Sequence, residues 1–163
     1  MTREKKAGEI MLPVDAYPRV HADASLRETL ESMARHRQNG TAGAALVVNG
    51  SGRPTGFITL RGVFKALEPP HSKVGDWPVP VFWDGLAEER CSRSEKISIA
   101  DYVEPLHTAC VQVGDNLLKV VHTLRRTRHH VLPVMDGDTP VGFIDAGAVF
   151  REICRLLGSA DKA

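Results

Sequence analysis

The chain has 163 residues, of which 21 are Lys or Arg and 20 are Asp or Glu, so its formal net charge is +1. This balance argues against a protein whose main role is to coat nucleic acid or an anionic membrane. Apolar residues make up 42% of the chain and charged residues 25%, as in an ordinary globular protein of one or two domains. No long apolar run follows MTREKKAGEI at the start, so neither a signal peptide nor a membrane span is expected.

The first structured segment, residues 19–37, predicts a strand, a turn and a helix. Ser25 and Glu28 have the spacing of a capping box at the start of that helix. The apolar positions that follow lie on one helical face: Leu26, Leu30, Met33 and Ala34. Residues 38–43 are then expected to form a loop, and residues 44–58 two strands joined by a turn at Gly50 and Gly52. A closing helix follows, with Leu60, Val63, Phe64 and Leu67 on its apolar side.

A connector at residues 69–96 follows the first unit. It is rich in proline, contains both tryptophans, Trp77 and Trp83, and predicts a short helix in DGLAEERC. Twenty-eight residues is long for a connection inside a compact module. The aromatic residues therefore indicate that the connector packs on its own domain or on a second subunit, and its role stays open between covering a cleft and building a dimer.

The second unit repeats the first. GFITLRGVF at 56–64 and GFIDAGAVF at 142–150 agree at five of nine positions, 86 residues apart. Upstream, residues 110–128 again predict strand, turn and helix, with Asp115 as the expected cap and Leu117, Val120, Val121 and Leu124 on the buried face. Residues 131–144 predict a hairpin that turns at Asp136-Gly137. The closing helix carries Val149, Phe150, Ile153, Leu156 and Leu157. Two units of about 60 residues would be marginal alone, so we expect them to share a core.

These motifs resemble those of the CBS-domain pair, also called the Bateman module. The resemblance rests on Ile10-Met11, Ser25-Leu26, the LPVMDG run at 132–137, and the paired GFITLRG and GFIDAGA. It implies an α+β fold of two β-α-β-β-α repeats, packed sheet to sheet about a pseudo-twofold axis, with repeat 1 at 7–68 and repeat 2 at 97–157. It also implies a regulatory, non-catalytic homodimer that binds AMP, ADP, ATP or S-adenosylmethionine in a cleft between the repeats.

The resemblance implies that a Thr hydroxyl at the strand-to-helix turn contacts phosphate or ribose, that an Asp three residues later holds the ribose, and that basic residues before the LPV strand neutralise phosphate. In the favoured cleft Thr59 is present, but Gly62 replaces the ribose Asp. The alternative interpretation of Thr59 is a plain helix cap. The residues assigned to this cleft are Thr59, Arg61, Gly62, Leu106, His107, Ala109, His129, His130, Val131, Leu132 and Pro133.

In the second cleft Asp145 replaces the Thr and Ala148 replaces the ribose Asp. A carboxylate caps a helix well but repels phosphate, so this cleft is expected to be degenerate for nucleotides. The residues assigned to it are Val14, Asp15, Tyr17, Ala44, Ala45, Asp145 and Ala148.

Other constellations are weaker. LRRTRHH at 124–130 fits either a ligand phosphate or a solvated helix end, and lacks the aromatic platforms of a nucleic-acid site. Adjacent His129 and His130 would point opposite ways on a strand, and the three widely spaced cysteines (Cys91, Cys110 and Cys154) fit reduced thiols in a cytoplasm, so no metal site is expected. The leading hypothesis is a cytoplasmic sensor subunit whose regulated protein the sequence does not name. The alternative is a dimeric scaffold that has lost nucleotide binding.

Overall fold

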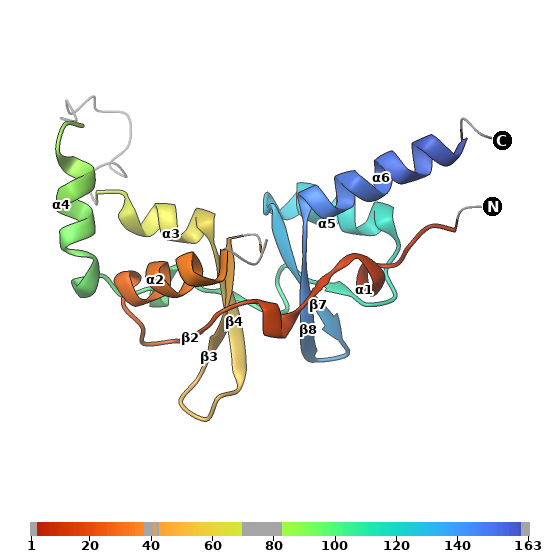
Figure 1. Cartoon of the computed structure of the whole chain (residues 1–163). Coiled ribbons are helices and arrows are strands. Elements are labelled where there is room, and N and C mark those ends of the chain that lie inside the picture. Colours follow the sequence, from red (N-terminus) through yellow and green to blue (C-terminus); the bar gives the residue numbers. More distant parts are fainter. Residues whose placement is uncertain (1–2, 38–40, 42, 70–82, 161–163) are drawn as a thin grey trace.

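The computed structural model of the protein describes residues 3–37, 41, 43–69 and 83–160 (Figure 1). Both repeats have the predicted order of strand, helix, strand, strand, helix. The first contains β2 (Arg19–His21), α2 (Leu26–Arg37), β3 (Ala44–Val48), β4 (Pro54–Thr59) and α3 (Leu60–Leu67). The second contains β6 (Val111–Gln112), α5 (Leu117–Thr127), β7 (Val131–Asp136), β8 (Thr139–Asp145) and α6 (Ala146–Ala160).

Each sheet is completed by a short strand that comes from outside its own repeat. The sheet orders are β2-β3-β4-β5 and β1-β8-β7-β6. β1 (Leu12–Pro13), near the start of the first repeat, pairs antiparallel with β8 of the second, and β5 (Glu104–Pro105), near the start of the second repeat, pairs antiparallel with β4 of the first. The repeats predicted at 7–68 and 97–157 therefore exchange their leading segments.

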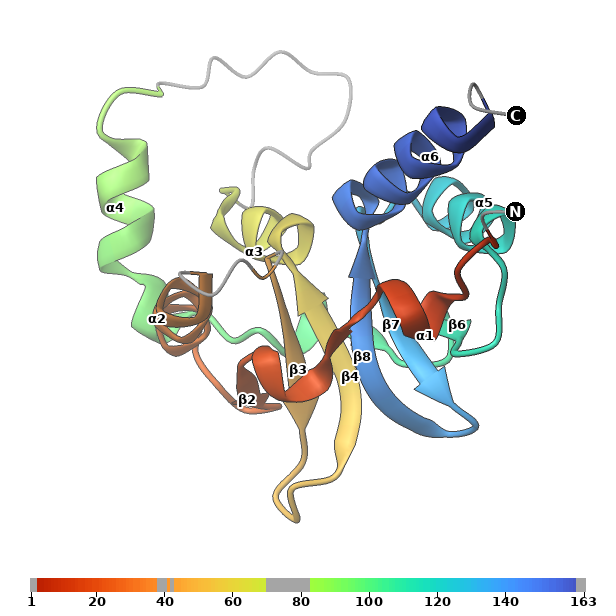
Figure 2. The same ribbon diagram turned by 45° about the vertical axis from the view of Figure 1, so that its right-hand side comes forward.

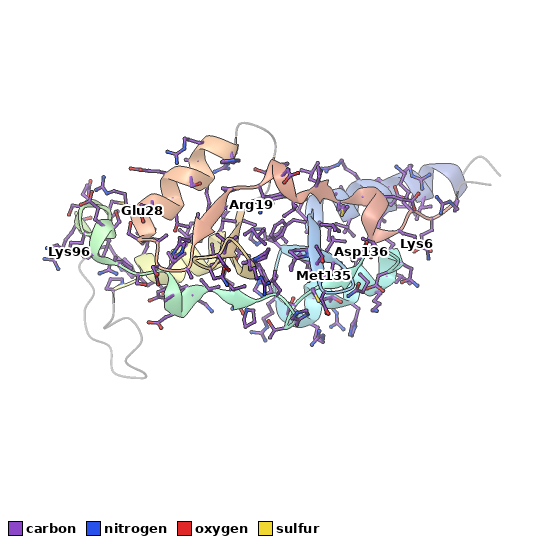
Figure 3. All side chains as sticks on the ribbon, turned by 90° about the horizontal axis from the view of Figure 1, so that it is seen from below. Lys6, Arg19, Glu28, Lys96, Met135 and Asp136 are labelled. Carbon is purple, nitrogen blue, oxygen red and sulfur yellow. The ribbon has the colours of Figure 1, made fainter. Side chains whose placement is uncertain are left out.

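The N-terminal segment lies on the second repeat as a result. α1 (Ala7–Ile10) packs beside β6 and α6, and Figure 3 places Lys6 at the end of the molecule opposite Glu28 and Lys96. Glu4 reaches α5, where its carboxylate accepts a hydrogen bond from the Leu117 N–H at 2.7 Å. Both chain ends consequently lie near α5 and α6 (Figures 1 and 2).

The strand exchange explains the glycine that begins GFI in both copies. A side chain on Gly56 would run into the Glu104 carbonyl of β5, and one on Gly142 would run into the Leu12 carbonyl of β1. Backbone can approach backbone this closely only where no Cβ intervenes. The repeated glycines therefore mark the two places where a strand crosses to the other repeat.

The main core lies between the two sheets. The rings of Phe57 and Phe143 lie 6.3 Å apart across it, and Tyr17 packs on Phe143 at 4.6 Å. β3 has both faces buried: alternate residues face the second repeat (Ala44 and Leu46) or the helices of the first (Ala45 and Val47). This arrangement holds the ends of β4 and β8, where each strand turns into a helix, at the interface between the repeats.

The helix caps agree with the sequence in the first repeat and differ in the second. At α2, the Ser25 N–H donates to Glu28 at 2.8 Å and the Glu28 N–H donates to the Ser25 hydroxyl at 3.2 Å, as predicted. At α5 the predicted Asp115 cap is wrong. The cap is Asn116, whose side-chain oxygen accepts from the Lys119 N–H at 3.0 Å. Asp115 instead accepts from the Gln112 N–H and the Lys119 ammonium group, both at 2.8 Å.

Several positions of the predicted apolar helix faces are exposed. Ala34 on α2 is one, and the large side chains of Phe64 on α3 and of Phe150 and Leu157 on α6 are the others. α4 (Leu86–Ser92) lies within the connector, where the short helix was expected. Trp77 and most of the connector prolines lie outside the described residues, whereas Trp83 is described and exposed.

Candidate functional site

Two strand-to-helix junctions, one in each repeat, occupy equivalent positions at the interface. Thr59 ends β4 opposite Ala44, and Asp145 ends β8 opposite Val131. The first N–H of each following helix is already used, because Leu60 donates to the Gly43 carbonyl at 2.9 Å and Ala146 donates to the His130 carbonyl at 2.8 Å. What distinguishes the junctions is therefore the side chain of the last strand residue.

The two side chains behave differently. The Asp145 carboxylate accepts a hydrogen bond from the Ala148 N–H at 2.9 Å, so it caps α6. Thr59 stands at the cap position of α3 and is buried, but its hydroxyl makes no capping hydrogen bond. The hydrogen bond from a helix N–H to the Thr59 hydroxyl, which a plain helix cap would make, is therefore missing. Its hydroxyl and the first turn of α3 remain open to another partner.

Two adjoining hollows beside Thr59 form what we call the Thr59 cleft. The inner one, of about 150 Å³, is lined by Thr59, Arg61, Gly62, Lys65, Asp101, Tyr102, Val103, Glu104 and His129. The outer one, of about 280 Å³, shares Arg61, Lys65, Glu104 and His129 and adds Thr108, Ala109, Arg126, Thr127 and Arg128. The cleft therefore joins α3 of the first repeat to the end of α5 in the second.

Positive charge is concentrated in the outer part of this cleft. The inner hollow carries Arg61 and Lys65 against Asp101 and Glu104, whereas the outer hollow adds Arg126 and Arg128 and has Glu104 as the only carboxylate among its described lining residues. Arg61 is held across the interface by donating to the Arg128 carbonyl at 3.1 Å. Arg128 itself ends α5 in the left-handed conformation, with φ 56°. Because these cations are brought together from separate elements, the cleft suits an anionic group such as phosphate.

His129 lies at the junction of the two hollows. Its ring meets the edge of Phe57 at 5.7 Å, and its Nδ1 is buried without a hydrogen-bond partner among the described residues. Burial lowers the pKa of His129 below its ordinary value of 6.5, and nearby Arg61 lowers it further, against an opposing effect of Glu104. These effects disfavour the protonated imidazole, and an anion beside the ring would favour it.

The position of the expected ribose Asp is filled by backbone from another segment. At Gly62, an added Cβ would lie 3.0 Å from the Tyr102 carbonyl oxygen and 3.0 Å from Cγ1 of Ile58. Tyr102 belongs to a 3-10 turn (Ala100–Tyr102) that leads into β5. Gly62 is therefore closely packed against the segment that leads into β5, and a side chain there would require Tyr102 or Ile58 to shift.

The structure brings together five residues predicted for this cleft: Thr59, Arg61, Gly62, Ala109 and His129. The other predicted residues line neither hollow. Leu106, Val131, Leu132 and Pro133 are buried in the core, and His107 is exposed. The sequence missed Lys65, Tyr102, Glu104 and Arg126. Lys65 follows Arg61 by one helical turn, which was a readable signal, whereas Tyr102 and Glu104 arrive only through the strand exchange.

The His130 side chain does not line the Thr59 cleft with that of His129. It lines a separate hollow of about 380 Å³ with Arg37, Thr41, Gly43, Ala44 and Leu60, among others. The two histidines, which lie between α5 and β7, therefore line different hollows, and the structure does not bring His130 into the Thr59 cleft. This hollow also contains Ala44, which was assigned to the second cleft.

Most of the residues predicted for the second cleft are either buried or already paired with another residue of the chain. Tyr17, Ala44, Ala45 and Ala148 are buried, and Asp15 is exposed and pairs with Arg19 at 3.3 Å. Val14 lies in a 3-10 turn (Val14–Ala16), and Asp145 lines neither hollow of the Thr59 cleft. Since the Asp145 carboxylate is already bonded to the α6 backbone, this junction offers much less to a ligand than Thr59 does.

The described residues contain neither a metal-binding cluster nor a membrane-spanning helix. Within residues 3–37, 41, 43–69 and 83–160, no cluster of three or more His, Cys, Asp or Glu side chains is arranged to hold a metal ion. Among the helices described, none combines the length and the apolar character required to cross a bilayer.

Two quasi-equivalent units that exchange strands and present a strand-to-helix junction on each side of their interface define a tandem-repeat α+β module. The chain belongs to the CBS-domain family, whose domain matches residues 7–69 and 100–155. No curated protein matches the sequence.

Solved structures of CBS-domain proteins share the fold. The CBS-pair protein CBSX2 from Arabidopsis thaliana is similar with a TM-score of 0.68 and 17% identity, over 94% of this chain and 97% of that one. CBSX2 in complex with AMP gives 0.62 and 18%, over 93% and 98%. The CBS domain of a bacterial CNNM/CorC family Mg²⁺ transporter, in complex with ATP, gives 0.61 and 16%, over 92% and 87%.

Proposed function

We propose that the protein is a regulatory CBS pair that binds an adenosine nucleotide in the Thr59 cleft and carries out no catalysis itself. The observation that carries the proposal is the set of cations around the unused Thr59 hydroxyl: Arg61, Lys65, Arg126 and Arg128. Phosphate oxygens would accept hydrogen bonds from these groups and from Thr59. Neighbouring CBS structures hold AMP and ATP, which supports the same ligand class here.

The charge of the cleft also ranks the ligands. AMP, ADP and ATP bring phosphates that the basic walls would neutralise, whereas S-adenosylmethionine brings a sulfonium cation that they would repel. We therefore propose that nucleotide phosphates, and the two or three of ADP and ATP above all, are preferred to S-adenosylmethionine. A cytoplasmic location, where these nucleotides are abundant, belongs to the same proposal.

The second candidate function is a scaffold that keeps the fold without a nucleotide. Two observations favour it: the inner hollow of about 150 Å³ is small beside the roughly 300–1,000 Å³ of ordinary ligand pockets, and the Tyr102 carbonyl oxygen lies only 3.0 Å from the position of a Cβ at Gly62, where the ribose Asp was expected. Nucleotide binding therefore requires that the base and ribose use the outer hollow or that the 3-10 turn at Tyr102 shifts.

Calorimetric titration of the full chain with adenosine, AMP, ADP, ATP and S-adenosylmethionine tests the proposal. We expect AMP or a more highly charged nucleotide to bind and adenosine to bind at least tenfold more weakly, since phosphate contacts supply the affinity. Thr59→Ala should weaken binding about tenfold. Thr139→Ala, at an exposed threonine that begins β8, should not change it. If none of the five compounds binds, the scaffold is the better description.

A further inference from the structure

A groove lies between α3 and α4, at the end of the molecule opposite α6 (Figures 1 and 2), and we call it the α3–α4 groove. It has a volume of about 290 Å³ and is lined mainly by apolar groups, including Phe64, Leu67, Trp83, Leu86, Ala87 and Cys91. The large rings of Phe64 and Trp83 are both exposed there. Two exposed aromatic rings in one apolar groove indicate a contact surface.

The walls of the groove are fixed to each other by Arg90. Its guanidinium donates to the Leu67 carbonyl at 2.9 Å and to the Ala66 carbonyl at 3.0 Å, at the end of α3 where helical carbonyls lack partners. α4 is thereby held beside α3, and the donors of Arg90 are used inside the chain. The groove is therefore built into the fold before any partner arrives.

The groove has room for two large side chains. Its volume is about twice the roughly 150 Å³ of a protein cavity that holds a benzene ring. A third helix lying between α3 and α4 would offer side chains three or four residues apart. Their burial would also remove the rings of Phe64 and Trp83 from water. The shape therefore fits an amphipathic helix with two apolar anchors.

Carboxylates surround the groove. Glu68 lines it, and Asp84 and Glu88 each directly follow a lining residue. All three acids are exposed, and none of them forms an ion pair within the described residues. Arg90, the cation of the lining, already donates to three backbone carbonyls. The rim is therefore negative, so it repels nucleic acid and anionic lipid and attracts a basic peptide.

We propose that the α3–α4 groove docks a basic amphipathic helix of the protein that this chain regulates. The apolar anchors of that helix enter beside Phe64 and Trp83, and its Lys or Arg side chains pair with the three carboxylates of the rim. The identity of the partner as the regulated protein rests on the proposed regulatory function, whereas the docking itself requires no nucleotide. α3 also lines the Thr59 cleft, so a docked helix contacts the same helix as a nucleotide.

A designed peptide tests this chemistry. The probe is a fluorescein-labelled helix of about 16 residues, with Leu on one face and Lys on the others. The comparison peptide has Glu in place of every Lys. Fluorescence anisotropy with the full-length protein should show that the Lys peptide binds at least about tenfold more tightly than the Glu peptide. No nucleotide is present, so failure of this binding is distinct from failure of the Thr59 cleft.

Phe64 and Phe150 provide a matched pair of variants. They occupy equivalent positions of the two repeats and are 60% and 65% exposed, but Phe64 lines the groove and Phe150 lies on α6. Phe64→Ala removes part of the groove wall and should weaken binding of the Lys peptide about tenfold. Phe150→Ala removes the same ring elsewhere and should leave the affinity unchanged.

Charge reversal separates the rim from the general field of the protein. Glu68→Lys with Glu88→Lys should weaken the Lys peptide about tenfold and strengthen the Glu peptide. Glu31→Lys with Asp138→Lys is the control, at exposed acids on α2 and in the β7–β8 turn. It changes the net charge equally and should leave both affinities unchanged.

Two native thiols report where the peptide lies on the unmodified protein. Cys91 and Cys154 are both exposed, and Cys91 lines the groove. A Lys peptide that carries a pyridyl disulfide beside its Leu face should exchange with Cys91 in preference to Cys154, releasing pyridine-2-thione. The Glu peptide with the same group gives the ratio that intrinsic reactivity alone produces.

Four results would overturn the proposal. Equal affinities for the Lys and Glu peptides, or no binding of either, show that the rim selects no basic helix. Equal losses in Phe64→Ala and Phe150→Ala place the peptide elsewhere. Binding that appears only after dilution to a monomer shows that a second copy covers the groove. Binding that appears only in Trp77→Ala shows that the chain's own connector fills it.

Discussion

The Thr59 and Asp145 junctions start from the same backbone and end with opposite properties. In both, a strand turns into a helix at the interface and the first helical N–H is bonded to a carbonyl across the sheet. Asp145 then caps its own helix, while the Thr59 hydroxyl makes no capping hydrogen bond and lies in a hollow that Arg61 and Lys65 also line. A single side chain therefore decides whether the junction is closed by the protein or left for a ligand.

The surroundings reinforce this difference. Arg61 follows Thr59 by two residues, whereas the corresponding position after Asp145 is Gly147. Lys65 corresponds to Arg151, so both helices keep a cation there. The end of α5 adds Arg126 and Arg128 to the Thr59 cleft. The two junctions therefore differ by Arg61 and by the basic end of α5.

The largest expected effect is the loss of nucleotide affinity when the basic walls are reversed. Lys65 and Arg126 are exposed and make no hydrogen bond or ion pair within the described residues, so their replacement should leave the fold intact. Lys65→Glu with Arg126→Glu should weaken AMP or ATP binding by 100-fold or more, at about 1.5–3 kcal/mol for each charged contact. Titration calorimetry measures this directly.

The matched control reverses two charges outside the cleft, with Arg53→Glu at the β3–β4 turn and Lys96→Glu beyond α4. This pair changes the net charge of the protein equally, so any general electrostatic effect appears in both variants. Equal affinities for the two double variants would show that the basic hollow is not the phosphate site.

The next effect concerns Gly62, where the sequence alone suggests restoring the ribose Asp. The 3.0 Å contacts of a Cβ with the Tyr102 carbonyl and Ile58 predict instead that Gly62→Asp destabilises the protein by about 1–3 kcal/mol. Urea denaturation measures that change. Gly62→Ala separates the steric part from the carboxylate, and we expect it to account for most of the loss. A stable Gly62→Asp protein with tighter nucleotide binding would show that the 3-10 turn yields easily.

Third in size is the difference in stability between alanine substitutions at the two junctions. Asp145→Ala removes the hydrogen bond to the Ala148 N–H and should lower the free energy of unfolding by about 1 kcal/mol. Thr59→Ala removes no cap and should cost less, within about 0.5 kcal/mol, while weakening nucleotide binding. Chemical denaturation of both variants, each without nucleotide, tests the contrast. Equal losses would mean that the two junctions are structurally equivalent.

The sequence predicted the parts of this molecule that depend on local patterns. The repeated strand-helix-strand-strand-helix order and the Ser25–Glu28 capping box both follow from periodicity or spacing. It failed where distant segments decide the outcome. β1 and β5 have two residues each and pair with strands of the other repeat. Two residues are too few for an alternating strand pattern to be recognised in the sequence.

The same limit explains the errors at the site. Asp115 and Asn116 are adjacent and either could cap α5; the choice fell to Asn116 because Gln112 and Lys119 engage the Asp115 carboxylate. At Gly62 the sequence shows that the ribose Asp is missing, but it does not show that the Tyr102 carbonyl, brought there by the strand exchange, packs against this position. A prediction from a sequence motif is thus most easily incomplete where a distant segment of the chain packs against that motif.

The smallest expected effect is the pH dependence that His129 gives the Thr59 cleft. Its pKa is lowered in the folded protein, chiefly by burial and further by Arg61, His130 and Lys65, while Glu104 opposes them. The unfolded chain then binds a proton at about pH 6.5 that the folded chain does not, so this group costs stability as the pH falls through 6.5 and costs none well above it. His129→Gln should flatten that part of the stability profile.

A bound phosphate should reverse the preference, because an anion beside the ring favours the imidazolium form. Nucleotide binding would then take up a proton, and affinity should rise a few-fold as the pH is lowered from 8 to 6. Titrations in two buffers of different ionisation enthalpy measure the uptake, and His129→Gln should abolish most of it. His122→Gln, at an exposed histidine on α5, is the control for the remaining histidines. Proton uptake that is unchanged in His129→Gln would place the nucleotide phosphates away from this ring, and hence outside the inner part of the cleft.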